Sequence, residues 1–100
     1  MSFKSFTSKD LEDEKRIIIV FATASWCGPC KSVKHWLPDE IKAYPNVRVR
    51  LLDVDKEADY AGKFDIEAMP TLIFLKNGKE LDRVKGNDIK EFRKLARKLC

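Results

Sequence analysis

The chain has 100 residues, 44% of them hydrophobic, and a formal net charge of +4 at pH 7. This length supports one domain, residues 1–100, with a modest core, and its longest apolar run, residues 17–22, is too short to span a membrane. The positive charge is spread along the chain. Its densest cluster, residues 90–98, alternates with apolar positions, which indicates a solvated helix face rather than a nucleic-acid site.

The N-terminal part of the chain predicts no targeting segment and three short elements. Residues 1–6 lack the apolar core of a secretory signal, and the acidic residues at 10–14 argue against a transit peptide, so we expect a cytosolic protein. A short strand is predicted over residues 3–6 and a brief helix over residues 8–14. Residues 17–22 are apolar on both faces, as is typical of a strand in the middle of a sheet.

The middle of the chain predicts a helix, a strand and a second helix. The first helix should begin near Cys30 and be kinked by Pro38, whose ring clashes with the preceding turn. Residues 47–51 alternate apolar and basic side chains, which predicts a strand with one buried face. Residues 56–63 predict a short helix that ends near Gly62. The apolar face of the first helix repeats at steps of three and four: Val33, Leu37, Ile41 and Tyr44.

The last third of the chain predicts a hairpin followed by a helix. Residues 71–75 and 80–85 predict two strands, and Asn77-Gly78 between them is a strong signal for a tight turn because both residues tolerate positive φ. Residues 89–99 predict an amphipathic helix that Asn87 or Asp88 can cap. The whole order of elements predicts a mixed sheet with helices on both faces, an α/β fold.

The most informative segment is Trp26-Cys27-Gly28-Pro29-Cys30-Lys31. Two cysteines separated by two residues can close a small disulfide ring, and Gly28 and Pro29 restrict the bend between them. The segment follows a predicted strand and begins a predicted helix, where the helix N-terminus favours a thiolate at Cys27. Lys31 is expected to help hold that thiolate. The pattern favours a redox-active dithiol.

The sequence disfavours two other interpretations of the cysteine pair. A zinc site is disfavoured because the chain offers only His35 and Cys100 as further Cys or His ligands, without the usual paired spacing. A purely structural disulfide is disfavoured by the two-residue spacing and by the reducing compartment we expect.

Several residues outside the segment have simpler interpretations. His35 is expected on the helix surface and Trp36 in half-buried packing. Asp53 and Asp55 are interpreted as solubilising carboxylates at a strand end rather than a metal pair. Cys100 is expected to be an inert terminal thiol, with a disulfide-linked dimer under oxidation as the alternative.

The chain resembles the thioredoxin family from about residue 17 to the C-terminus. Four features support the resemblance: the 26–31 segment, Ala68-Met69-Pro70-Thr71, Lys76-Asn77-Gly78, and Gly86 after the last strand. The resemblance implies a thioredoxin fold, with a central mixed sheet of four to five strands flanked by about four helices. It also implies a cis peptide bond before Pro70, close to the dithiol.

The resemblance implies a function as well. Cys27 would be the exposed attacking thiolate and Cys30 the deeper resolving thiol of a protein-disulfide reductase, and the two would form the redox-active disulfide. Gly28, Pro29, Lys31 and Pro70 would support this site together with Trp26. A wider set would line the substrate surface: Trp26, Pro29, Ala68, Met69, Pro70 and Gly86.

The expected partners are disulfide-containing proteins and a thioredoxin reductase-type recycling enzyme. We expect no bound cofactor, metal, nucleic acid or membrane, and a monomer. Two alternatives remain open at this stage. One is a thioredoxin-fold binding subunit whose cysteines are incidental, and the other is a more oxidising disulfide exchanger or isomerase.

The chain departs from the family pattern at three places. Phe21 stands where many members carry a buried aspartate, and Leu51 stands where a basic residue often faces that aspartate, so both members of a charged pair are replaced by apolar side chains. His35 replaces a family proline, which moves the helix kink toward Pro38. Lys85 stands before Gly86, where the family usually presents an apolar residue. A cation at that position favours acidic partners.

Overall fold

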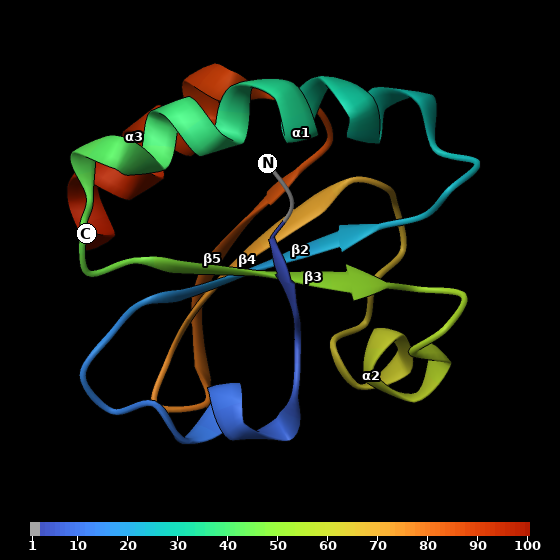
Figure 1. Cartoon of the computed structure of the whole chain (residues 1–100), viewed down its shortest axis with the longest axis horizontal. Helices are drawn as coiled ribbons and strands as arrows, with labels where there is room; N and C mark the ends of the chain where they lie inside the picture. The colour runs from blue at the N-terminus through green and yellow to red at the C-terminus, as the bar shows by residue number, and fades with distance from the viewer. Residues whose placement is uncertain (1–2) are drawn as a thin grey trace.

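A five-stranded mixed sheet forms the centre of the protein in a computed structural model that describes residues 3–100 (Figure 1). Met1 and Ser2 lie outside the described residues. They are the first two residues of segment 1–6, which was predicted to lack a secretory signal. The sheet order is β1-β3-β2-β4-β5. Its first three strands run parallel, and β4 runs antiparallel to both β2 and β5. The strands are β1 (Lys4–Ser5), β2 (Ile18–Thr23), β3 (Arg48–Asp53), β4 (Thr71–Lys76) and β5 (Lys79–Lys85).

Helices cover both faces of the sheet, as predicted. In Figure 1, α1 (Gly28–Glu40) and α3 (Ile89–Leu99) lie together across one face. The other face carries α2 (Ala58–Lys63) and the 3-10 helix η1 (Ser8–Glu12). The described residues thus contain three α-helices where about four helices were expected, because the predicted helix over residues 8–14 is a 3-10 helix.

The central strand β2 is buried along its whole length. Its side chains alternate between two hydrophobic clusters, because successive residues of a strand point to opposite faces. Ile19 and Phe21 belong to the cluster beneath α1 and α3. Ile18 and Val20 belong to the cluster beneath α2 and η1, together with Phe6. The near-continuous apolar run at residues 17–22 is therefore explained by burial on both sides.

The α1 helix ends close to the proline that was expected to disturb it. Pro38 lies inside α1, and the α-helix stops at Glu40. The chain then continues as a short 3-10 helix, η2 (Ile41–Ala43). The missing N–H of Pro38 and its steric crowding affect the turn before it, and the Ile41 N–H still bonds to the Leu37 carbonyl. The predicted helical face therefore reaches Tyr44 through a 3-10 turn.

Local signals in the second half of the chain are mostly confirmed. Asn77 and Gly78 have φ of 52° and 76° and form the predicted tight turn between β4 and β5. Asp88 caps α3, and its carboxylate accepts the Glu91 N–H at 3.0 Å. The prediction that α2 ends near Gly62 is confirmed, because the helix ends at Lys63. The left-handed conformation after the helix occurs at Asp65, with φ of 53°.

Candidate redox site

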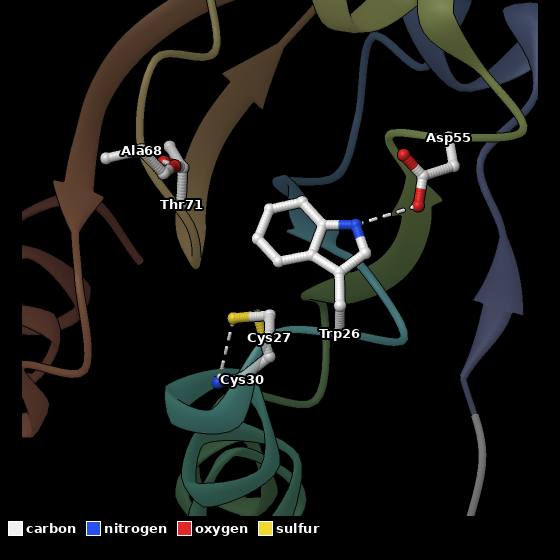
Figure 2. Close-up of a disulfide and its surroundings, with 6 residues drawn as sticks. All are labelled: Trp26, Cys27, Cys30, Asp55, Ala68 and Thr71. Carbon is white, nitrogen blue, oxygen red and sulfur yellow. Dashed lines mark hydrogen bonds between the residues drawn. A yellow bond between two sulfur atoms is a disulfide. The ribbon is translucent and has the colours of Figure 1, made fainter.

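The two cysteines of the 26–31 segment form a disulfide at the N-terminus of α1 (Figure 2). Their Cα atoms are 5.4 Å apart. Cys27 is the N-cap residue of α1, and its sulfur accepts a hydrogen bond from the Cys30 N–H at 3.2 Å. Gly28 and Pro29 provide the first turn, where a proline removes no helical hydrogen bond. The sulfur of Cys27 therefore faces the backbone N–H groups and the positive end of the helix dipole.

Cys27 is less accessible than the resemblance implied. Its residue exposure is 4%, against 1% for Cys30, so the expectation of an exposed Cys27 is wrong for this disulfide state. The physical reason is that its sulfur is bonded to Cys30 and turned toward the first turn of α1. Gly28 and Pro29, in contrast, are exposed beside it. Access to the sulfur is therefore controlled by the residues around it.

Trp26 is the largest exposed side chain next to the disulfide. It is 67% exposed, which is unusual for so large an apolar group. Its indole N–H donates a hydrogen bond to the carboxylate of Asp55 at 3.0 Å, and Figure 2 shows the N–H pointing toward that residue. The hydrogen bond fixes the ring beside the cysteines. Asp55, interpreted from sequence as a solubilising carboxylate, therefore has a specific structural partner.

A second wall of the site comes from the segment before β4 and from the loop after β5. The peptide bond between Met69 and Pro70 is cis, as the resemblance implied. Ala68 is exposed, and its carbonyl accepts the Thr71 hydroxyl at 2.6 Å; Figure 2 shows both residues across from the cysteines. The Gly86 N–H donates to the Pro70 carbonyl at 2.8 Å, which joins the two segments.

The interior beneath the disulfide is apolar. Phe21 is fully buried, and it lies in the same hydrophobic cluster as both cysteines. Leu51 is half-buried against this cluster and pairs directly with Phe21 across β2 and β3. The predicted replacement of a charged pair by two neighbouring apolar side chains is thus visible in the structure.

One polar atom in this region has no partner. The Thr23 hydroxyl is buried and makes no hydrogen bond within the described part of the chain. Thr23 also lines a pocket of about 200 Å³ together with Lys34, Leu51 and Asp53. Such an unpaired buried hydroxyl is uncommon in folded proteins.

Two solvated lysines lie near the site, in addition to the Asp55 carboxylate that accepts the Trp26 N–H. Lys31 and Lys85 are exposed, and Lys85 lies opposite Thr71 in the pairing of β5 with β4. Elsewhere, the hydrogen bond with Arg93 lowers the pKa of Glu40, and that with Arg83 lowers the pKa of Glu80. The clearest carboxylate pKa shifts thus arise in ion pairs rather than beneath the disulfide.

Three further observations concern the described residues as a whole. Across residues 3–100, no group of three or more His, Cys, Asp or Glu side chains is arranged to hold a metal ion. Within the same residues, no helix has the length and apolar character needed to cross a membrane. Cys100 is a free, exposed cysteine, and partial desolvation raises the pKa of its thiol.

The sequence interpretation missed two long-range contacts of the site. One joins Trp26 to Asp55, and the other joins the Trp36 indole N–H to the Asn87 side-chain oxygen at 2.9 Å. The partners are 29 and 51 residues apart. No local pattern signals such pairs. His35 and Trp36 are exposed and half-buried, respectively, as predicted.

Comparisons with known proteins agree with this geometry. The sequence model of the thioredoxin family matches residues 2–99. Thioredoxin H-type 1 of Nicotiana tabacum is 40% identical over 84 residues, which are 84% of this chain and 66% of that protein. Thioredoxin H-type of Picea mariana is 43% identical over 74 residues, which are 74% of this chain and 59% of that protein. The chain thus spans just under two thirds of the length of these curated relatives.

Solved structures match over nearly the whole chain. Oxidised mitochondrial thioredoxin 3 from Saccharomyces cerevisiae superimposes with a TM-score of 0.89 at 28% identity, covering 97% of this chain and 95% of that one. A thioredoxin from Nicotiana alata gives a TM-score of 0.85 at 33% identity, covering 98% and 96%. With the five-stranded mixed sheet and the family match over residues 2–99, the chain belongs to the thioredoxin family.

Proposed function

We propose that this protein is a thiol-disulfide oxidoreductase that reduces protein disulfides through Cys27 and Cys30. The observation that carries the proposal is the Cys27–Cys30 disulfide at the N-terminus of α1, with the Cys27 sulfur accepting the Cys30 N–H. A helix N-terminus stabilises a thiolate, which is the nucleophile in disulfide exchange. Family membership and the Pro70–Gly86 wall beside the cysteines support the same proposal.

The reaction starts from the reduced dithiol. The Cys27 thiolate attacks one sulfur of a substrate disulfide, forms a mixed disulfide, and releases the other substrate sulfur as a thiolate that takes up a proton. Cys30 then loses its proton and attacks the Cys27 sulfur. This second step forms the Cys27–Cys30 disulfide and releases the remaining substrate thiol. Two electrons pass from the protein to the substrate in each cycle.

The surrounding residues have supporting roles in this proposal. Trp26 and Pro29 present apolar surface beside the attacking Cys27 sulfur, and Trp26 is held by Asp55. Lys31 supplies positive charge near the thiolate. An extended substrate segment would lie along the second wall and pair with backbone groups there in a strand-like manner. That wall consists of Ala68, Met69, Pro70 and Gly86.

The oxidised protein must be reduced again before the next cycle. A reductase of the thioredoxin reductase type would supply the two electrons, so the protein would transfer electrons toward protein disulfides and contribute to cell redox homeostasis. We place this activity in the cytosol, with the protein acting as a monomer and without a resident cofactor. The basic residues near the site favour acidic partner surfaces.

The test is reduction of insulin disulfides with dithiothreitol as the recycling reductant, in a Cys100→Ser background that removes the third thiol. The unmodified dithiol is expected to turn over, whereas Cys27→Ser should abolish turnover. Cys30→Ser should stop after one attack and accumulate a mixed disulfide that mass spectrometry detects. Full activity in a Cys27→Ser, Cys30→Ser double variant would contradict the proposal and support a binding module instead.

A further inference from the structure

The loop that carries Gly86 is held by hydrogen bonds to the segment before β4 and to α3. Gly86 has φ of 86°, in the left-handed region that favours glycine, and its N–H donates to the Pro70 carbonyl at 2.8 Å. Two residues later, Asp88 caps α3 through the Glu91 N–H. These contacts tie the loop to the segment before β4 and to α3. They do not tie it to the helix that carries the cysteines.

A third contact supplies that connection. The indole N–H of Trp36 on α1 donates to the side-chain oxygen of Asn87 at 2.9 Å. The Trp36 ring is half-buried and packs against the fully buried Phe92 of α3, with ring centroids 5.4 Å apart and planes inclined by 55°. Because this packing fixes the ring, the direction of its N–H is fixed as well.

The position of Trp36 on α1 gives the contact its importance. Cys27 caps α1, Cys30 lies in its first turn, and Trp36 follows Cys30 by six residues, about 9 Å along the helix axis. A regular helix transmits position well over this length. The Trp36–Asn87 hydrogen bond therefore connects the disulfide-bearing helix with the residue next to Gly86.

A second connection between α1 and α3 offers a natural comparison. Arg93 on α3 donates two hydrogen bonds to the carboxylate of Glu40, both at 3.0 Å. Glu40 is the last residue of α1, at the end opposite the cysteines. Both contacts lie in the layer formed by α1 and α3. Only the Trp36–Asn87 contact involves the loop at the proposed substrate surface.

We infer that Trp36 and Asn87 are positioning residues that hold the Gly86 loop in register with the cysteines, so that a docked protein segment presents its disulfide to Cys27. This inference rests on the proposed function. A loop that is already held in its docking position loses less conformational freedom when a protein segment binds, so this contact should strengthen docking without changing the chemical step. A small disulfide that does not contact the loop should not depend on this contact.

The test compares a protein disulfide with a small one. Asn87→Ala removes the acceptor, Trp36→Phe removes the donor while keeping an aromatic ring against Phe92, and Asn87→Asp keeps an acceptor oxygen. Arg93→Gln is the matched control, because it removes the other contact between α1 and α3. The measured quantities are KM and kcat for insulin, and the rate with 5,5′-dithiobis(2-nitrobenzoate).

Loss of one neutral hydrogen bond corresponds to a factor of about three to ten, so Asn87→Ala and Trp36→Phe should each raise KM for insulin by about that factor. The value of kcat and the rate with the small disulfide should stay unchanged. The double variant should be no worse than either single variant, because both remove the same contact. Asn87→Asp should restore most of the wild-type KM, and Arg93→Gln should retain it.

Several results would overturn the inference. One is a KM for insulin that is unchanged in both single variants, or that rises equally in Arg93→Gln. Another is a double variant in which the two increases in KM add, or an equal loss of rate with the small disulfide. A wild-type protein that fails to reduce insulin would remove the proposed function and this inference with it. An active wild type whose variants match it would remove the inference alone.

Discussion

The outward and inward sides of the Cys27–Cys30 disulfide are built differently. On the outward side, Trp26, Asp55 and the Pro70–Gly86 wall form a surround that internal hydrogen bonds hold in place. On the inward side, the buried Phe21 and half-buried Leu51 form an apolar floor. A buried ion pair is often no more stabilising than an apolar pair of similar size. In the proposed reaction, the outward side would therefore serve substrate recognition and attack by Cys27, whereas proton transfer at Cys30 would occur over a floor that offers no charged group.

Phe21→Asp tests this difference most strongly. It removes a fully buried ring and introduces an unpaired carboxylate, so the free energy of unfolding should fall by about 3 to 5 kcal/mol. At the same time, a carboxylate beneath the cysteines should accept the Cys30 proton and speed the resolution of mixed disulfides. Stopped-flow measurement of substrate release from a preformed mixed disulfide reports this step.

Phe21→Asn is the matched control, because it loses the same packing without adding a group that accepts a proton at neutral pH. Faster resolution in the aspartate variant but not in the asparagine variant would support the comparison. Equal rates in the two variants, or no acceleration, would show that the floor does not limit the resolving step.

Lys85→Glu probes the outward side. Lys85 lies at the end of β5 beside Gly86, so reversing its charge should lower kcat/KM for an acidic substrate protein by about three- to tenfold at low salt. The effect should disappear near 1 M salt, where the Debye length is about 3 Å. Lys79→Glu, at the other end of β5, makes the same change in net charge and should have little effect. Equal losses in both variants would assign the effect to net charge rather than to the site.

The pH dependence of stability should arise at the surface rather than beneath the cysteines. Hydrogen bonding with Arg83 lowers the pKa of Glu80 from 4.5, so its stabilising contribution is complete above about pH 4.5 and is lost as the pH falls through the lower folded-state value. Glu80→Gln should remove this contribution, worth at most about 1 kcal/mol for a partly exposed pair. Urea unfolding at pH 3 to 7 measures it. An unchanged pH profile in Glu80→Gln, with Glu12→Gln as control, would contradict the assignment.

Thr23→Val should have the smallest effect. The Thr23 hydroxyl is buried without a partner, so replacing it with a methyl group of similar shape should change stability by less than about 1 kcal/mol, in the stabilising direction. Thr71→Val is the contrasting case, because the Thr71 hydroxyl donates to the Ala68 carbonyl and its loss should destabilise the fold by about 1 kcal/mol. Equal destabilisation by both substitutions would show that Thr23 does have a hydrogen-bond partner.

The fold was predictable from sequence wherever a local pattern determines local structure. The apolar run before the cysteines became the central strand β2, and Asn77-Gly78 became the tight turn between β4 and β5. Periodicity alone placed α1 and α3. The left-handed conformation after α2 was not predictable, because it occurs at Asp65 rather than at a glycine.

The candidate site was predictable only in part, for a physical reason. The cysteine segment and the apolar replacements at Phe21 and Leu51 are visible in the sequence, because each depends only on which amino acid occupies the position. The burial of Cys27 belongs to the disulfide state, in which its sulfur is bonded to Cys30 and turned toward the first turn of α1, and residue types alone do not specify that orientation. The same holds for Asp55, whose hydrogen bond to Trp26 depends on how β3 lies beside β2.

The reduction potential of the Cys27–Cys30 pair tests the account most directly. It is measured in the Cys100→Ser variant by equilibration with a thiol buffer, with fluorescence of Trp26 reporting the redox state. We expect a value near the −270 mV that is the general figure for thioredoxins, to within roughly 30 mV. A value near about −180 mV, in the range of protein disulfide isomerase, would contradict a reductase and indicate an exchanger that oxidises or isomerises its substrates.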